Sequence, residues 1–95
     1  MPPRRAREQA GTMRIVTRFF ANTRDIVGSH EVRLRVADGT TLSGLLELLF
    51  AKHPRLRPFE ETMLVAVNEE FAEPATVLRD GDEVAIMPPV SGGGA

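Results

Sequence analysis

The chain has 95 residues, 42% of them hydrophobic, and its 12 basic and 13 acidic side chains give a net charge of −1. This length suits one small domain, and because there is no cysteine, disulfides, thiolate metal sites and cysteine nucleophiles are excluded. The balanced charge argues against a nucleic-acid or membrane-surface partner, and no apolar run approaches the roughly 18 residues that span a bilayer. We therefore expect a cytoplasmic protein with protein partners.

The two ends of the chain differ in composition from its centre. Residues 1–12 are polar and arginine-rich, and no apolar segment follows them as it would in a secretion signal. We predict a disordered N-terminal arm over residues 1–12, a folded domain over residues 13–90 and a flexible glycine-rich tail over residues 91–95. The sequence has no internal repeat and predicts no second domain.

Two strands joined by a short helical turn are predicted first. Residues 14–20 are dense in β-branched and aromatic side chains, which favour strands. Residues 21–27 form the expected helical turn, which Gly28 ends. Residues 30–36 alternate polar and apolar side chains, as is typical of a half-exposed strand, with one face made of Val32, Leu34 and Val36. The two strands are expected to pair as a hairpin.

One long amphipathic helix follows the hairpin. A turn at Asp38–Gly39 precedes Thr40 and Thr41, either of which could cap a helix that begins near Leu42. The apolar spacing i, i+3, i+4, i+7 predicts one buried stripe of Leu42, Leu45, Leu46 and Leu49. The helix should end before Pro54, because the residue before a proline avoids helical geometry.

The remaining segments predict a loop and further strands. Residues 56–61 are expected to form a connecting loop. Residues 63–67 predict a strand that turns at residues 68–69 into a brief return strand. A tight turn at residues 80–82 leads into the last strand, residues 83–87.

This order of elements predicts the fold class. The order is β-β-α-β-β-β, with the fifth element the shortest strand, and a single amphipathic helix has to cover one face of a mixed sheet. The result is a two-layer α+β roll. Residues 83–87 have the most continuous apolar face, so we expect this strand in the centre of the sheet, parallel to residues 14–20.

The polar side chains offer no catalytic or metal-binding constellation. His30 and His53 each lack a second ligand at metal spacing. The acidic pairs at residues 60–61 and 69–70 lie beside turns and are expected to be solvated. The Asp-Gly-Asp run at residues 80–82 lacks the spaced ligands of a calcium loop. We expect no catalytic residue and no metal site.

The C-terminus is the most informative segment. Pro88 and Pro89 have no amide donor for a β-ladder and direct the chain out of the last strand. Gly92, Gly93 and Gly94 then carry no side chain that would block close approach by another protein. No helical pattern follows the glycines, so they do not predict a phosphate-binding loop. The pattern favours a terminal carboxylate that enters a narrow enzyme site, where adenylation makes its oxygen a leaving group for a sulfur donor.

Four segments resemble the MoaD/ThiS sulfur carriers, which are small ubiquitin-like β-grasp proteins. They are FFANTRDIVG, GTTLSGLLELL, VAVNEE and, most specifically, LRDGDEVAIMPPVSGG. The start of the chain and the proline-containing segment after the helix resemble the MoaD branch. The resemblance implies a β-grasp roll and a sulfur carrier without catalysis of its own, which bears a thiocarboxylate on Gly93.

The same resemblance implies partners and cofactors. A MoaD-like chain is the small subunit of molybdopterin synthase in molybdenum cofactor biosynthesis, and its tail enters a MoaE-like large subunit. A MoeB/ThiF-like adenylyltransferase, similar to ubiquitin-activating enzymes, first activates the tail with ATP and Mg²⁺, and a persulfide donor supplies the sulfur. Docking is implied for a surface that contains Phe20, Met87, Pro88, Pro89 and Val90. Many relatives have aromatic residues where this chain has Ile86 and Met87, and methionine adapts to varied partners.

The chain extends beyond the Gly-Gly end that is usual in the family. A C-terminal peptidase could trim it to Gly93, or remove Ala95 alone and leave Gly94 as the functional end. Alternatively, the chain carries sulfur for another pathway, such as cysteine, thiamine, tRNA thiolation or a thio-metabolite, or it is a ubiquitin-like module for non-covalent binding or conjugation. We favour trimming, because the rest of the tail keeps the family pattern.

Overall fold

The computed structural model describes residues 11–88 of the chain. Its elements are, in chain order, strand β1 (Thr12–Phe19), helix α2 (Ala21–Val27), strand β2 (Glu31–Ala37), helix α3 (Leu42–Lys52), the 3-10 helix η1 (Pro54–Phe59), and strands β3 (Leu64–Val67), β4 (Glu70–Phe71) and β5 (Glu83–Met87). Residues 1–10 of the predicted arm lie outside the described residues, as do Pro89, Val90 and the tail over residues 91–95.

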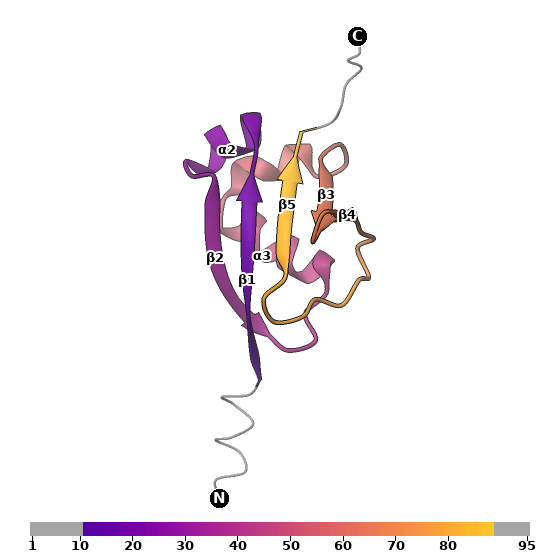
Figure 1. Ribbon diagram of the computed structural model, residues 1–95. Helices are drawn as coiled ribbons and strands as arrows, with labels where there is room; N and C mark the ends of the chain where they lie inside the picture. Colours follow the sequence, from indigo (N-terminus) through magenta and orange to yellow (C-terminus); the bar gives the residue numbers. More distant parts are fainter. Residues whose placement is uncertain (1–10, 89–95) are drawn as a thin grey trace, which may run out of the picture.

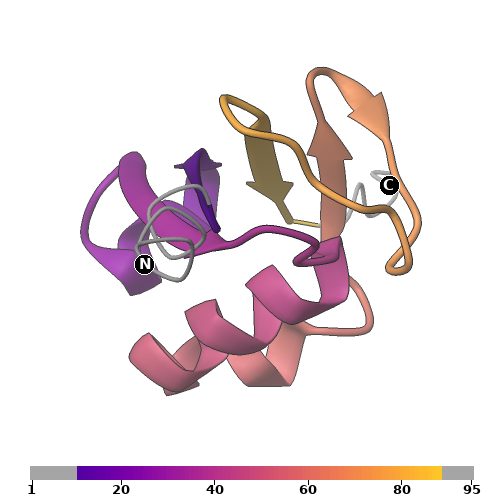
Figure 2. The ribbon, with the colours of Figure 1, turned by 90° about the horizontal axis from the view of Figure 1, so that it is seen from below.

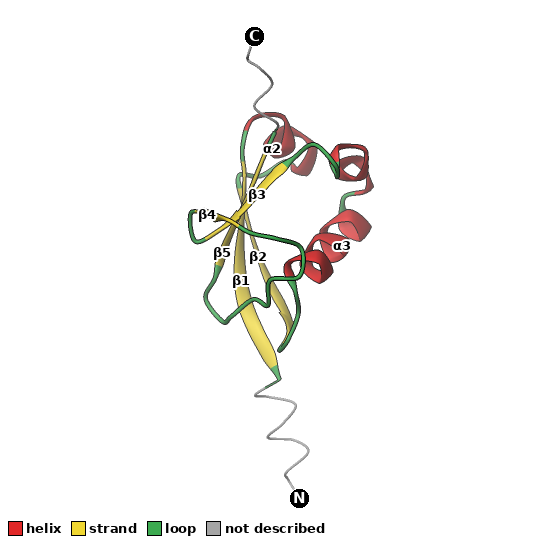
Figure 3. Ribbon diagram, turned by 90° about the vertical axis from the view of Figure 1, so that its right-hand side faces the viewer, coloured by secondary structure: helices red, strands yellow, loops and turns green. Residues whose placement is uncertain are grey.

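The strands form one five-stranded mixed sheet in the order β2-β1-β5-β3-β4 (Figure 1). Strand β1 pairs with β2 in antiparallel and with β5 in parallel orientation, and β3 pairs antiparallel with both β5 and β4. The prediction that the last strand is central and parallel to the first is therefore confirmed. Helix α3 lies on one face of the sheet only, so that the molecule has two layers (Figures 2 and 3). The predicted α+β roll is confirmed.

The core lies between α3 and the sheet. Every second side chain of β1 is buried, as are Val84 and Ile86 of β5. The buried side chains of α3 include Leu42, Leu45 and Leu49. Burying a side chain of this size contributes about 1.5–3 kcal/mol. The predicted leucine stripe is confirmed, with Leu46 partly buried at its margin.

Threonine side chains fix the start of α3. The hydroxyl oxygen of Thr41 accepts a hydrogen bond from the Gly44 amide at 3.1 Å, which makes Thr41 the cap residue. The hydroxyl of Thr40 instead donates to the carbonyl of Ala37 at 2.6 Å and stabilises the preceding turn. The helix ends at Lys52 as expected, and the amide of the next residue, His53, donates to the Leu49 carbonyl at 2.7 Å.

The predicted loop over residues 56–61 is wrong. Residues Pro54–Phe59 form the helix η1, with Pro54 in its first turn, where a missing amide costs no hydrogen bond. The Leu56 amide donates to the His53 carbonyl at 2.9 Å, and the Leu56 side chain is completely buried. Two prolines suggested irregular structure, but burial of one leucine between them favours a compact turn of helix.

No helix within residues 11–88 has both the length and the apolar character needed to cross a membrane.

Candidate functional site

The candidate site begins where β5 ends. Met87 is the last residue of β5 and pairs with Leu64 of β3, whereas Pro88 lies beyond the strand. Proline lacks the amide that would continue the ladder, so Pro88 ends the pairing. Strand β5 therefore delivers the C-terminal residues at one end of the sheet, beside α2 (Figure 1).

The side chains of β5 alternate between the core and the open face of the sheet, which is the face opposite α3. Val84 and Ile86 are completely buried, so Ala85 and Met87 point to the open face. The expectation that Ile86 and Met87 share a docking surface is therefore wrong for Ile86. Successive residues of a strand lie on opposite faces, so of Ile86 and Met87 only Met87 has its side chain on the open face.

A buried threonine ties α2 to the end of β5. The Thr23 hydroxyl lies within hydrogen-bond distance of the carbonyl oxygens of Phe20, at 2.7 Å, and Ile86, at 3.1 Å. Its oxygen also accepts from the Phe20 amide at 3.1 Å, and that amide lies 3.2 Å from the Ile86 carbonyl. Since a hydroxyl has one proton to donate, the carbonyls of Phe20 and Ile86 share it, while the Phe20 amide donates to the hydroxyl oxygen. Phe20 is thereby held beside the last residues of β5, with its side chain 45% exposed.

Ala21, which starts α2, has a φ of +54°. This left-handed conformation costs a residue other than glycine about 1–2 kcal/mol. Unusual backbone geometry of this kind clusters at functional sites. Here it directly follows Phe20, whose amide donates to the carbonyl of Ile86 near the end of β5.

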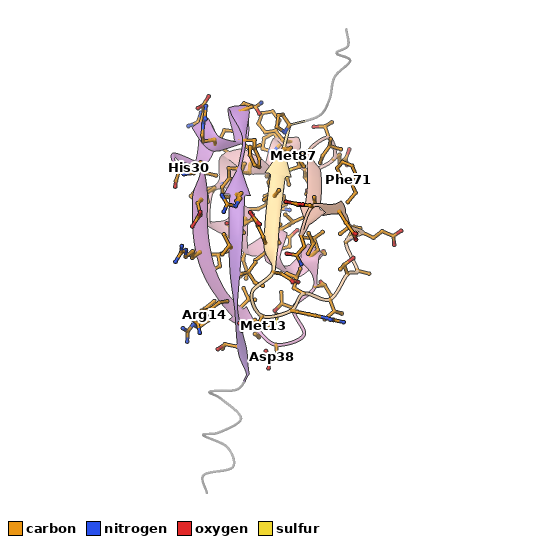
Figure 4. All side chains as sticks on the ribbon, in the orientation of Figure 1. Met13, Arg14, His30, Asp38, Phe71 and Met87 are labelled. Carbon is orange, nitrogen blue, oxygen red and sulfur yellow. The ribbon has the colours of Figure 1, made fainter. Side chains whose placement is uncertain are left out.

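Apolar side chains gather on the open face near this end. Leu64 pairs with Met87, and Ala66 pairs with both Ala85 and Phe71, so these side chains share one face of β5, β3 and β4. Phe71 is 75% exposed. Figure 4 shows Phe71 and Met87 at the half of the sheet where β5 ends. We call the following residues the apolar surface: Phe20, Leu64, Phe71, Ala85 and Met87. Phe20 and Phe71 are exposed and the other three are partly exposed, and apolar groups that share an accessible face indicate an interaction site.

Charged side chains border the apolar surface. Arg18 of β1 lies on the open face between two carboxylates, those of Glu31 on β2, at 3.6 Å, and of Glu83 on β5. Exposed ion pairs contribute little stability, about 0–1 kcal/mol. These ion pairs place charged side chains across β2, β1 and the start of β5, so that the apolar residues of β5, β3 and β4 lie beside them.

The structure describes only part of the predicted site. It places Phe20 beside Ile86, to whose carbonyl the Phe20 amide donates, and Met87 and Pro88 directly follow Ile86 at the end of β5. Pro89, Val90, Gly92, Gly93 and Gly94 lie outside the described residues. Phe71 was not predicted, because a strand of two residues has no periodicity; its one signal was an aromatic side chain directly after the turn at residues 68–69.

The other polar candidates have structural roles. Asp80 accepts a hydrogen bond from the Arg14 amide at 2.7 Å, and Asp82 accepts from the Arg79 amide at 2.8 Å and from the Asn68 side chain at 2.9 Å. The acidic run at residues 80–82 is thus a turn, as predicted. Within residues 11–88, no group of three or more histidine, aspartate or glutamate side chains is placed to hold a metal ion.

Comparison with known proteins gives a consistent result. A model of the ThiS family matches residues 17–93. The molybdopterin synthase sulfur carrier subunit of Chlamydomonas reinhardtii is 40% identical over 83 residues, which cover 85% of this chain and 100% of the relative. The subunit of the same name from Arabidopsis thaliana is 30% identical over 86 residues, or 90% of each chain.

Solved structures agree with these matches. The crystal structure of SAMP1 from Haloferax volcanii has a TM-score of 0.74 at 32% identity and covers 83% of this chain and 98% of its own. A ubiquitin from Caldiarchaeum subterraneum, at 18% identity and a TM-score of 0.62, covers 86% of this chain and 99% of its own. The expected ubiquitin-like β-grasp fold is confirmed.

Proposed function

The chain belongs to the ThiS family, and from this premise we propose that it carries sulfur as a thiocarboxylate on its C-terminal glycine. We further propose that it donates this sulfur as the small subunit of molybdopterin synthase. The curated relatives are sulfur carrier subunits, so the chain is a carrier and not an enzyme. Their shared name supports the molybdopterin assignment in particular.

The observation that carries the proposal is the position of β5. This strand is hydrogen-bonded on both sides and has a buried inner face, so it is a rigid support for whatever follows Pro88. Residues 89–93 can span at most about 17 Å when extended. A glycine carboxylate on such a support could reach the interior of a partner enzyme while the domain stays docked outside.

The proposed chemistry needs no side chain of this protein. A carboxylate oxygen attacks the α-phosphorus of ATP in an adenylyltransferase that also binds Mg²⁺, and pyrophosphate leaves. The terminal sulfur of a persulfide donor then attacks the acyl carbon and AMP leaves. A thiol of the donor cleaves the resulting acyl disulfide, which releases the thiocarboxylate. In the large subunit the thiocarboxylate sulfur bonds to a pterin precursor, and water then hydrolyses the acyl–sulfur bond, which leaves the sulfur on the precursor and regenerates the carboxylate.

The apolar surface is the proposed docking site for both enzymes. A MoeB/ThiF-like adenylyltransferase and a MoaE-like large subunit would each need to hold the domain while the tail is in their active site. Phe20 and Phe71 offer exposed aromatic rings, and Met87, the last residue of β5, offers a partly exposed thioether. Aromatic and methionine side chains are enriched at protein interfaces. One surface would therefore serve successive partners.

We also propose that a peptidase removes the residues beyond Gly93. The family match ends at Gly93, two positions short of the last residue, Ala95. Adenylation of Ala95 would activate a carboxyl group two residues beyond Gly93, on a residue that has a methyl side chain. Removal of Ala95 alone, with Gly94 as the end, is the second form of this proposal.

A second function is conjugation to other proteins or sulfur supply to another pathway. The structural likeness to the H. volcanii small archaeal modifier protein 1, at 27% identity and a TM-score of 0.73, favours this alternative. Both functions begin with the same adenylation. They differ in whether the activated glycine is transferred to sulfur or to a lysine amine.

The proposal is tested by ATP–pyrophosphate exchange with the adenylyltransferase of the native host. Four forms are compared: the full chain, chains that end at Gly94 and at Gly93, and a chain that ends at Gly93 but lacks Gly92. We expect exchange with the chain ending at Gly93 and loss of it without Gly92. Equal exchange by the full chain would contradict trimming, and no exchange by any form would contradict the carrier function. The unfolding midpoint should be the same for all forms.

A further inference from the structure

Strand β2 forms one edge of the sheet, and β4, which carries Phe71 of the apolar surface, forms the other. In its pairing with β1, the amide of Phe19 donates to His30 at 3.0 Å and that of Asp38 donates to Gly11 at 2.7 Å. Hydrogen-bonded pairs alternate along an antiparallel ladder. The backbone amides and carbonyls of the even-numbered residues of β2 therefore form hydrogen bonds with β1. The odd-numbered residues direct theirs outward, away from the sheet.

The outward backbone groups differ along the edge. Those of Glu31 are capped by Ser29, whose hydroxyl donates to the Glu31 carbonyl at 2.8 Å and accepts from its amide at 3.3 Å. No hydrogen bond within residues 11–88 caps the outward groups of Arg33 and Arg35. These two residues offer unpaired donors and acceptors that an added strand could use.

Three arginines gather on the open face beside this edge. Arg14 of β1 lies directly opposite Arg35 of β2, and Arg33 lies one pleat further along β2. Like charges directly opposite each other destabilise a sheet. Arg33 pairs with Glu31 at 3.1 Å, but within residues 11–88 neither Arg14 nor Arg35 forms an ion pair. Figure 4 shows Arg14 in the half of the sheet away from Met87 and Phe71.

The arginines line a shallow concavity of about 460 Å³. The turn at Asp80 and Gly81 forms part of its wall. The Asp80 carboxylate is already engaged, since it accepts the hydrogen bond from the Arg14 amide at 2.7 Å. The concavity therefore presents mostly positive charge, next to an open strand edge.

The core-facing side of the edge has the opposite character. Val32 and Leu34 pack against the core but remain partly exposed. Side chains of a strand added beside β2 would alternate between the two faces, as those of β2 do. One set would meet Arg33 and Arg35, and the other would meet Val32 and Leu34.

We propose that the β2 edge binds an extended segment of a protein partner in which acidic and aliphatic residues alternate. The segment adds to the sheet as a further strand. A second copy of this chain is disfavoured as the partner, because pairing of two β2 edges would bring Arg33 and Arg35 close to the same arginines of the other copy, and like charges repel. The N-terminal segment is disfavoured for the same reason, since Arg4 and Arg5 bring positive charge. This site lies on the opposite sheet edge from β4 and does not depend on the function of the tail.

The probe is a blocked heptapeptide of alternating aspartate and valine, added to the full-length ¹⁵N-labelled chain and followed by amide chemical shifts. We expect the largest shifts at residues 31–36 and weaker binding at higher salt. Two peptides serve as controls: one has lysine in place of aspartate, and one is N-methylated at alternate residues. Loss of binding by both controls is expected, because the first removes charge complementarity and the second removes the donors of the added strand.

Variants of the chain test the arginines. The double substitution Arg33→Glu/Arg35→Glu should weaken binding of the aspartate peptide by about tenfold or more. The matched control Lys52→Glu/Arg55→Glu changes the net charge equally on exposed residues of another face and should bind as the wild type does. Equal binding by the N-methylated or lysine peptide, or shifts centred outside β2, would overturn the proposal. So would shifts at β2 caused by oligouridylate but not by the aspartate peptide.

Discussion

Thr23 is the residue on which the geometry of the candidate site depends most. It is completely buried, and its hydroxyl joins the start of α2 to the carbonyl of Ile86 at the end of β5. Thr23→Val keeps the shape and removes these hydrogen bonds, so it should lower the free energy of unfolding by about 1–3 kcal/mol. Urea unfolding measures the change. Thr62→Val, at an exposed hydroxyl, is the control and should stay within about 0.5 kcal/mol; equal effects of the two would contradict this role.

Glu69 has a backbone conformation that is unfavourable for any residue with a side chain. Asn68 and Glu69 form the two-residue turn between β3 and β4, with φ values of +52° and +73°, as a type I′ turn requires. Glycine adopts such values without the cost that a Cβ brings. Glycine removes the cost of the left-handed conformation but increases the conformational entropy of the unfolded chain. The balance of the two effects should raise the free energy of unfolding of Glu69→Gly by about 0.5–1 kcal/mol.

Thermal unfolding tests the Glu69 prediction. The melting temperature of Glu69→Gly should rise. Glu70→Gly is the matched control, because it removes the same side chain from extended backbone in β4 and should lower the melting temperature. A fall for Glu69→Gly would show that the glutamate side chain contributes more than its backbone conformation costs.

At the scale of elements, α3 and η1 are joined by a charged pair. Both oxygens of the Glu47 carboxylate accept hydrogen bonds from Arg57, at 2.9 and 3.1 Å, and these bonds lower the pKa of Glu47. A lowered pKa in the folded state stabilises the protein above the ordinary carboxyl pKa. That contribution is lost as the pH falls through the lowered value.

The pH dependence of unfolding tests this pair. Wild type should be more stable than Glu47→Gln at neutral pH, and the difference should shrink as the pH falls below about 4. A double-mutant cycle with Arg57→Gln isolates the pair from the contact of Arg57 with the Phe50 ring. A difference that stays constant over the whole range would contradict the assignment.

Strand β4 carries the most exposed residue of the apolar surface, Phe71. It has two residues, and Phe71 is 75% exposed on the open face. Phe71→Ala should leave stability within about 0.5 kcal/mol, but it should raise the KM of the adenylyltransferase for the carrier by about tenfold. Val77→Ala, at a 58% exposed residue outside the apolar surface, is the control and should leave KM unchanged. Equal KM values for both variants would contradict docking through β4.

Elements with a periodic pattern could be predicted from the sequence, whereas those defined by tertiary contacts could not. The bounds of β5, the leucine stripe of α3 and the central place of β5 follow from apolar spacing. Helix η1 depends on burial of Leu56 between two prolines, which no local pattern shows. The hydrogen bond between Thr23 and Ile86 joins residues 63 positions apart and has no sequence signal.

At the scale of the whole molecule, one helix layer leaves the other face of the sheet open. That face carries the apolar surface beside the end of β5, paired charge around Arg18, and the arginines beside the β2 edge. The proposed adenylyltransferase and large subunit would thus bind where β5 ends, whereas the proposed acidic partner would bind along the β2 edge. This arrangement would allow an acidic partner to bind at the β2 edge while one of these enzymes holds the end of β5.

The central claim is that the C-terminal glycine carries sulfur, and intact-mass spectrometry of the protein from its native host tests it most directly. We predict a chain that ends at Gly93 or Gly94 and in which sulfur replaces one oxygen atom, and alkylation of the thiocarboxylate should shift that mass. A full-length, unmodified chain in cells that contain an active adenylyltransferase would contradict the claim.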